Sequence, residues 1–337
     1  MTQALYTVDE VSVMIREGKK LLLAGDAKLL SQLPKGDWIG GTTPYFILYP
    51  EKLVESHEKL FVNCLPDFVE TTEIREYDSE SIKNIYNDAP QNGLTILIIP
   101  FSSPVHIEFA VNVPGYENFA GYPLCGWIAG QPLDIIMTEK SYVRSGASGI
   151  LTSNLAVAMH VSLPGNKFAE IHTFNQYEPS NGDVITFEYN GMIVEDAVIN
   201  GVKQNFADYL SGININIGDI PLVANYSGAM VITNCSDVKD NRVYMAAPVF
   251  EHIEYRFAVR KAEVSEPKTT GNVVFSTTCA SNYLRPELCK RLIKNVNGPA
   301  VFGEIAYQML NEATLYIAIG DVPLDNEINI NYHNLLQ

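Results

Sequence analysis

Cys279 and Glu304 are the residues near the C-terminal end whose side chains are best suited to chemistry. Cys279 ends the run FSTTC, and Glu304 is the one acid in the otherwise apolar run PAVFGEIAY at 299–307. A cysteine beside a base can act as a nucleophile, and a carboxylate in an apolar setting is seldom buried without a partner. We therefore predict that Glu304 receives a ligand's amine. The alternative is a cap or turn acid that bonds to nearby amides.

Two similar stretches, DWIGG at 37–41 and GWIAG at 126–130, read as strands that end on glycine. Such glycines leave the backbone bare for a ligand or for a neighbouring segment, so two of them predict a shared crevice; close packing without a ligand is the alternative. Trp38 and Trp127 should then lie on neighbouring or facing strands. Bare amides and threonine hydroxyls can cradle a polar or anionic group. We predict one ligand-binding cavity, with no metal and no cofactor, formed by Gly40, Gly41, Thr42, Thr43, Gly130, Cys279, Gly303 and Glu304.

Motifs of known enzyme classes are absent from the sequence. It contains no H-E-x-x-H, G-x-S-x-G, Walker loop or G-x-G-x-x-G, and none of its six histidines stands in a recognisable partner motif for Cys279. Five cysteines without C-x-x-C spacing predict neither a disulfide framework nor a zinc site. We therefore assign no catalytic residue, and a thiol nucleophile at Cys279 remains the alternative.

Composition restricts the partners and the location. The 337 residues carry a net charge of −16, which repels polyanions, so we expect no nucleic-acid partner. The longest apolar stretch, LTILIIPF at 94–101, is far shorter than the roughly 20 residues of a spanning helix. The start of the chain carries acids and no continuous apolar segment, which argues against a secretory signal. We expect a cytoplasmic protein without membrane insertion.

Helix and strand signals alternate in the first half of the chain. Thr7 and Glu10 have the spacing of a capping box, which predicts a helix from about 8 to 18. LTILIIPF reads as a buried strand, and Ser103-Pro104 after it has a capping serine and a first-turn proline, so a helix should follow. This alternation predicts a layered α/β domain with mixed sheets flanked by helices.

From about residue 150 the sequence becomes richer in β-branched and aromatic residues, which predicts mainly antiparallel strands and an α+β character. Asn190-Gly191 lies between ITFEY and MIVED and predicts a tight hairpin. We expect a helix at about 198–210 after it. The two halves together predict two layered domains, α/β to α+β in class, with the ligand crevice between them.

The order of segments near the C-terminus resembles the FIST family of bacterial sensory domains. The resemblance rests on FSTTC (275–279), the helical run PELCKRLIKNV (286–296), PAVFGEIAY and LNEATLYIAI (310–319), with WIGGTT (38–43) similar to the family's glycine-ended strand. The arginine that follows the cysteine segment in the family is here Arg285, further along the chain. The resemblance implies a FIST N-like domain at 1–178, a FIST C-like domain at 179–337, and binding of a small molecule that is amino-acid-like.

From these observations we expect a bacterial, cytoplasmic sensory module that binds a small molecule. The sequence shows no kinase, methyl-accepting or cyclase output region, so signal transduction would need a separate signalling protein. Two alternatives stay open. One is a cysteine-dependent, hydrolase-like enzyme that uses the same crevice, and the other is a non-catalytic scaffold that binds only protein.

Overall fold

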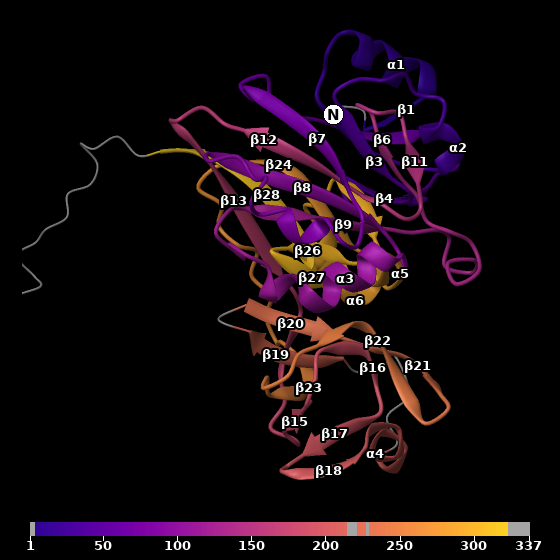
Figure 1. Ribbon diagram of the computed structural model, residues 1–337, viewed down its shortest axis with the longest axis vertical. Helices are drawn as coiled ribbons and strands as arrows, with labels where there is room; N and C mark the ends of the chain where they lie inside the picture. The colour runs from indigo at the N-terminus through magenta and orange to yellow at the C-terminus, as the bar shows by residue number, and fades with distance from the viewer. Residues whose placement is uncertain (1–3, 214–220, 227–228, 323–337) are drawn as a thin grey trace, which may run out of the picture.

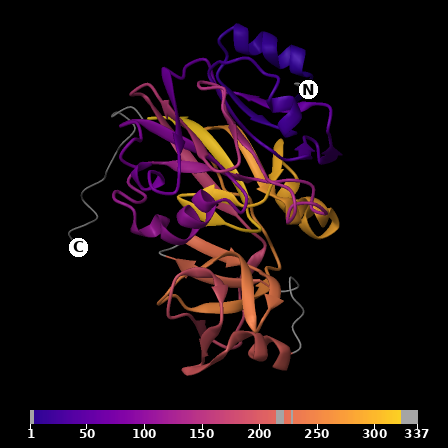
Figure 2. The ribbon, with the colours of Figure 1, turned by 45° about the vertical axis from the view of Figure 1, so that its right-hand side comes forward.

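The structure is a computed structural model that describes residues 4–213, 221–226 and 229–322. Within these ranges the fold is mixed α+β, with several mixed sheets and short helices (Figure 1). Three six-stranded sheets form a body, and strands from 177–260 form a separate lobe below it in Figures 1 and 2. No helix in the described ranges is both long and apolar enough to cross a membrane.

The first sheet of the body holds the first tryptophan strand. Helices α1 (Val8–Arg16) and α2 (Ala27–Leu30) pack on its outer face. The capping box of Thr7 and Glu10 begins α1, as the sequence predicts. In spatial order the strands are β1 (Leu5–Tyr6), β6 (Leu60–Cys64), β2 (Leu21–Ala24), β3 (Trp38–Gly41), β10 (Val143–Ser145) and β11 (Leu151–Thr152).

The second sheet holds the second tryptophan strand and Glu304. Its outer face is covered by α3 (Pro104–Asn112), which begins at the Ser103 cap as expected, and by the short helices η1 (Ile82–Asn84) and η2 (Val113–Gly115). In spatial order the strands are β27 (Gln308–Leu310), β26 (Glu304–Ala306), β9 (Leu124–Ala129), β8 (Gly93–Pro100), β12 (Ala156–Ser162) and β7 (Thr71–Tyr77).

The third sheet combines strands from the N-terminal part, the middle and the C-terminal part of the chain. Helices α5 (Ala280–Leu284) and α6 (Pro286–Ile293) follow its strand β24. In spatial order the strands are β13 (Lys167–Phe174), β28 (Thr314–Asp321), β24 (Asn272–Cys279), β25 (Gly298–Val301), β4 (Tyr45–Leu48) and β5 (Lys52–Glu55). The second and third sheets therefore combine strands from both sides of residue 178, so the two expected domains share hydrogen-bonded sheets.

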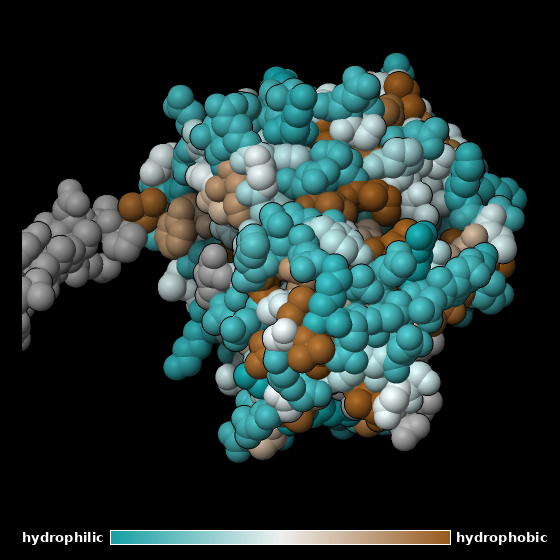
Figure 3. Space-filling view, turned by 60° about the horizontal axis from the view of Figure 1, so that its bottom comes forward, coloured by the Kyte–Doolittle hydropathy of each residue, from teal (hydrophilic) through white to brown (hydrophobic). Residues whose placement is uncertain are grey.

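The lobe is a two-sheet insertion between β13 and β24. It carries helix α4 (Phe206–Gly212) and turns a mainly hydrophilic face with separate hydrophobic patches to solvent (Figure 3). Its larger sheet contains β18 (Val202–Asn205), β17 (Asp196–Ile199), β15 (Ile185–Thr186), β23 (Tyr255–Arg260), β19 (Leu222–Tyr226), β20 (Ala229–Thr233) and β14 (Tyr177–Pro179). Its smaller sheet contains β16 (Gly191–Val194), β22 (Arg242–Val249) and β21 (Cys235–Lys239).

The prediction of a hairpin at Asn190-Gly191 is wrong, because the strands on its two sides do not pair with each other. Strand β15 pairs with β17 and β23, whereas β16 pairs with β22. The Asn190 side chain instead accepts a hydrogen bond from the amide of Glu251 at 2.8 Å. The tight hairpin forms at Asn200-Gly201, where both residues have positive φ and β17 pairs with β18. The helix expected from about 198 consequently begins only at Phe206.

The tryptophan strands β3 and β9 face one another across the body. A Cβ atom added to Gly41 would lie 3.2 Å from Nε1 of Trp127. The expectation of facing strands in the N-terminal half is therefore confirmed. The two indoles lie in different clusters, because Trp38 packs beneath α1 while Trp127 lies in the main core between the sheets.

Candidate functional site

Strands β9, β24 and β26 bring Cys279, Trp127 and Glu304 to one region of the core. Cys279 ends β24, which pairs in parallel with β25, and the chain bends at Gly303 before entering β26. Glu304 lies directly opposite Trp127 in the antiparallel pair β26–β9, so both side chains emerge from the same face of the sheet. The φ of +152° at Gly303 favours glycine at this bend.

Glu304 is a fully buried acid with an incomplete set of partners. Its side chain is 0 % exposed, and Oε2 accepts one long hydrogen bond of 3.4 Å from the amide of Ala313. In the described part of the chain, Oε1 has no hydrogen-bond partner. Burial, with a smaller contribution from the nearby Glu312, raises the pKa of Glu304 well above its ordinary value. Burial therefore favours the neutral carboxylic acid over the carboxylate at this position.

Trp127 contributes a second polar atom without a partner. Its indole is 1 % exposed, and no described residue accepts a hydrogen bond from Nε1. Buried polar groups are nearly always paired, so two unpaired polar atoms on neighbouring strands mark an unusual place in the core. An occupant that accepts from Trp127 and donates to Glu304 would satisfy both.

Glu312 is a second buried acid with the opposite environment. It is 2 % exposed and lies in the turn between β27 and β28 with a φ of +53°. One oxygen accepts from the hydroxyl of Tyr177 at 2.6 Å, and the other accepts from Asn234 at 2.6 Å and from Arg285 at 3.1 Å. Tyr177 and Asn234 belong to the lobe, so Glu312 joins the lobe to the body beside Glu304.

Cys279 lies close to both acids and is held as a thiol. Its Sγ donates to Oδ1 of Asn311 at 3.4 Å. Burial raises the pKa of the Cys279 thiol to about 12. None of the five histidines in the described ranges hydrogen-bonds to it. A thiolate, which is the nucleophilic form, is therefore disfavoured in the resting protein.

The glycines and threonines of the predicted site come together, but their polar groups already have partners. The amide of Thr42 donates to the carbonyl of Tyr142 at 2.9 Å, and the hydroxyl of Thr43 donates to that of Ala300 at 2.7 Å. Gly40 and Gly41 pair with β2 and β10, and the amide of Gly130 donates to Thr42. The expected amide cradle at Thr42 is therefore wrong, because the strand ladder uses its amide.

Close packing explains the glycines directly. A Cβ on Gly41 would lie 2.6 Å from Ile98, and one on Gly130 would lie 1.9 Å from the ring of Phe302. Phe302 stands directly before Gly303 and Glu304, so this contact sets the path of the chain into the site. The glycines shape the site, while Glu304 and Trp127 supply its unpaired polar atoms.

The site is closed to solvent. Five pockets of about 200 to 480 Å³ lie elsewhere on the described residues, and none is lined by a residue of the predicted site. One of them lies nearby, because its lining residue Phe101 packs against Phe302 with ring centroids 6.4 Å apart. Within the described ranges, no three His, Cys, Asp or Glu side chains are grouped to hold a metal ion.

Sequence reasoning missed the residues that complete this region. Glu312 could have been found by the argument used for Glu304, because it also stands beside an apolar run, in NEATLYIAI. Asn311 and Arg285 belong to segments that the sequence singles out. Tyr177 and Asn234 gave no local signal, because their contacts with Glu312 arise only when the lobe packs on the body.

Comparison with known proteins places the chain in a family. A search of the curated proteins finds no match. Residues 6–320 match a family described as "Family of unknown function (DUF6976)". This match includes the body, the lobe, and all the residues of the site. Because it covers most of the chain, the protein belongs to that family.

Proposed function

We propose that this protein is a small-molecule-binding sensory module whose ligand places a protonated amine against Glu304. The observation that carries the proposal is the fully buried carboxyl of Glu304, which has one oxygen without a partner. Trp127 offers an unpaired donor on the same face of the sheet. A ligand must therefore offer an amine to Glu304 and, beside it, an acceptor for the indole N–H of Trp127.

The electrostatics of the site favour a cation over an anion. The carboxyl of Glu312 lies beside Glu304 and raises the pKa of both Glu304 and Cys279. Arg285, the cation that contacts this region, already bonds to Glu312. A ligand ammonium group would replace the proton of Glu304 and pair with the carboxylate that results. Binding should therefore release a proton.

A closed site suits a sensor. Because Glu304 is fully buried, a ligand must displace the surrounding side chains to reach it. The amide of Ala313 bonds to Glu304, and its neighbour Glu312 holds the lobe through Tyr177 and Asn234. Occupancy at Glu304 would therefore alter the contact between body and lobe, which a separate signalling protein can read.

The resemblance to the FIST sensory domains supports the same function, because its C-terminal segments are those that build the site. Cys279, Glu304 and the LNEAT segment at 310–314 converge in the structure. The raised pKa of the Cys279 thiol disfavours the hydrolase-like alternative.

Thermal unfolding with a panel of small amines, amino acids and carboxylates tests the proposal. A ligand at 100 times its dissociation constant should stabilise the wild type by about 2.7 kcal/mol. Glu304→Gln should abolish this stabilisation, whereas Glu58→Gln, at an exposed acid, should keep it. Stabilisation by carboxylates alone, or an equal response in Glu304→Gln, would remove Glu304 from the site. Consumption of a panel compound would support the enzyme instead.

A further inference from the structure

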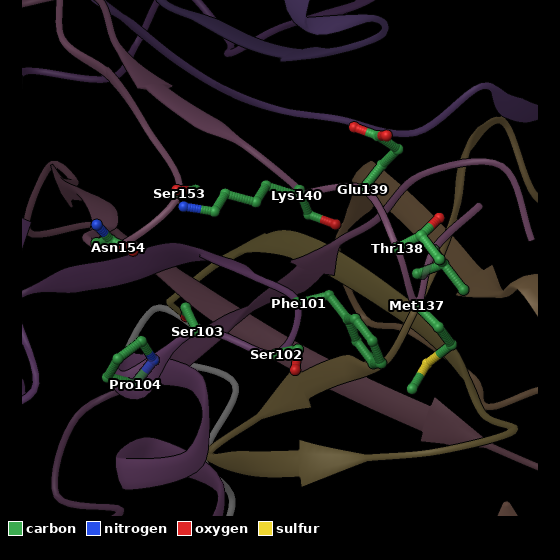
Figure 4. Close-up of a pocket in the computed structure, with 12 residues that line it drawn as sticks. Phe101, Ser102, Ser103, Pro104, Met137, Thr138, Glu139, Lys140, Ser153 and Asn154 are labelled. Atoms are coloured by element: carbon green, nitrogen blue, oxygen red, sulfur yellow. The ribbon is translucent and has the colours of Figure 1, made fainter.

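An open pocket lies where β8 turns into α3, near the buried acids, but neither Glu304 nor Glu312 lines it. It has a volume of about 200 Å³ and is formed by the β8–α3 turn, the loop before β10, and residues 153–154 (Figure 4). Hydroxyl groups dominate its polar lining. Its polar lining includes Ser102, Ser103, Lys140, Ser141, Ser153 and Asn154.

The turn that forms one wall is held in a fixed conformation. Ser102 has a φ of +59°, and its amide donates to Nδ1 of the buried His106 at 3.1 Å. Ser103 caps α3, because its hydroxyl accepts from the amide of His106 at 3.1 Å and donates to the carbonyl of Pro100 at 2.7 Å. The N-terminal end of this nine-residue helix thus lies at the pocket. Its dipole favours negative charge there.

Lys140 gives the pocket a cation that no acid neutralises. No described carboxylate forms an ion pair with its amine, although the protein carries a net charge of −16. Figure 4 shows the Lys140 side chain extended towards Ser153 and Asn154, while the carboxylate of Glu139 points away from them. Of the two charged residues that line the pocket, Lys140 is therefore the one whose charged group extends to the side of Ser153 and Asn154.

Ser141 is an independent sign that the pocket is built for an occupant. Ser141 is among the residues that line the pocket and is 2 % exposed, yet its hydroxyl has no hydrogen-bond partner among the described residues. An unpaired hydroxyl that is almost fully buried is uncommon in a folded protein. It can bond to an anion that also contacts the neighbouring Lys140.

We propose that this pocket binds a phosphate group, as the free ion or as a small phosphate monoester. The amine of Lys140 would supply the charge, the helix end would add its dipole, and the hydroxyls of Ser102, Ser141 and Ser153 would bond to the oxygens. A tetrahedral anion matches hydroxyl donors that converge from three segments. Glu304 does not line this pocket, so phosphate binding here can be tested independently of the proposed amine site.

Calorimetric titration with inorganic phosphate and with methyl phosphate, at constant ionic strength, tests the proposal. We expect saturable binding to the wild type and binding about tenfold weaker in Lys140→Gln, because a hydrogen bond to a charged group is lost. The matched control is Lys52→Gln, an exposed lysine on β5, which should bind as the wild type does. Binding of both ligands indicates a site open to esters, and binding of the free ion alone indicates one that fits only inorganic phosphate.

A second variant and a second anion sharpen the test. Ser153→Ala keeps the charge of the pocket and should also weaken binding, which separates a built site from simple attraction to Lys140. Acetate at the same ionic strength should bind far more weakly than phosphate. The proposal is overturned if the wild type shows no saturable binding, if Lys140→Gln and Lys52→Gln lose affinity equally, or if acetate binds as well as phosphate.

Discussion

Glu304, on β26, and Glu312, in the turn between β27 and β28, are two buried acids whose carboxyls have opposite environments. Glu312 accepts hydrogen bonds from Tyr177, Asn234 and Arg285, whereas Glu304 accepts one long bond from the amide of Ala313. The first is satisfied by groups from other segments and holds the lobe to the body. The second is left with an unpaired oxygen. This contrast separates a structural acid from a candidate binding acid.

The pH dependence of stability should reveal Glu304. An acid whose pKa is raised by burial keeps its proton in the folded protein after the unfolded chain has lost it, so the free energy of unfolding falls as pH rises between the two pKa values. From about pH 5 upward, Glu304→Gln should therefore gain stability relative to the wild type. Urea unfolding at a series of pH values measures this difference. A constant difference across the series would show that Glu304 is not held neutral.

Glu312→Gln should destabilise the protein by about 2 kcal/mol, because one of the two buried oxygens that accept from Tyr177 and Asn234 is lost. Glu287→Gln, at an exposed acid in the first turn of α6, is the control and should change stability little. Urea unfolding compares them. Equal midpoints for the two variants would contradict the role of Glu312 in holding the lobe.

Two buried histidines should make the protein sensitive to acid. Burial lowers the pKa of His106 and of His160 to about 4 from an ordinary value of 6.5. Between these values the unfolded chain binds protons that the folded protein does not, so stability falls as pH falls. Each histidine should contribute a slope of up to about 1.4 kcal/mol per pH unit. His160→Gln should reduce the slope in thermal unfolding below about pH 6.5, and an unchanged slope would exclude His160 as its source.

The sequence predicted where helices begin better than it predicted which strands pair. The capping box at Thr7, the Ser103 cap, and the facing tryptophan strands follow from local signals, and the structure confirms them. The hairpin at Asn190-Gly191 failed because three Asn-Gly pairs occur between residues 181 and 201, and tertiary pairing selected the last, at 200–201. Local patterns cannot show that β13 and β24 share a sheet through β28.

The candidate site was predictable to a similar extent. Glu304 and Cys279 could be named because their residue types stand out from their surroundings, and the structure brings them close together. The sequence could not show that the amide of Thr42 is already hydrogen-bonded, because its partner, the carbonyl of Tyr142, is far along the chain. The unpaired oxygen of Glu304 likewise follows from packing across β9 and β26 and from no local pattern.

Cys279 should resist alkylation in the folded protein. Its thiol is 5 % exposed and its pKa is raised to about 12, so little thiolate forms near neutral pH. Cys64, which is exposed, provides the internal reference. Mass spectrometry after treatment with iodoacetamide should show Cys64 modified first and Cys279 modified only after unfolding. Rapid modification of Cys279 in the folded protein would favour the thiol-enzyme alternative.

The central claim is that Glu304 exchanges its proton for a ligand's amine, and calorimetry in two buffers of different ionisation enthalpy measures this directly. The amine that stabilises the wild type most is titrated into the wild type and into Glu304→Gln near neutral pH. We expect the wild type to release close to one proton for each amine bound. We expect the variant to release none and to bind far more weakly. Unchanged affinity in Glu304→Gln, or binding by the wild type without proton release, would contradict the account.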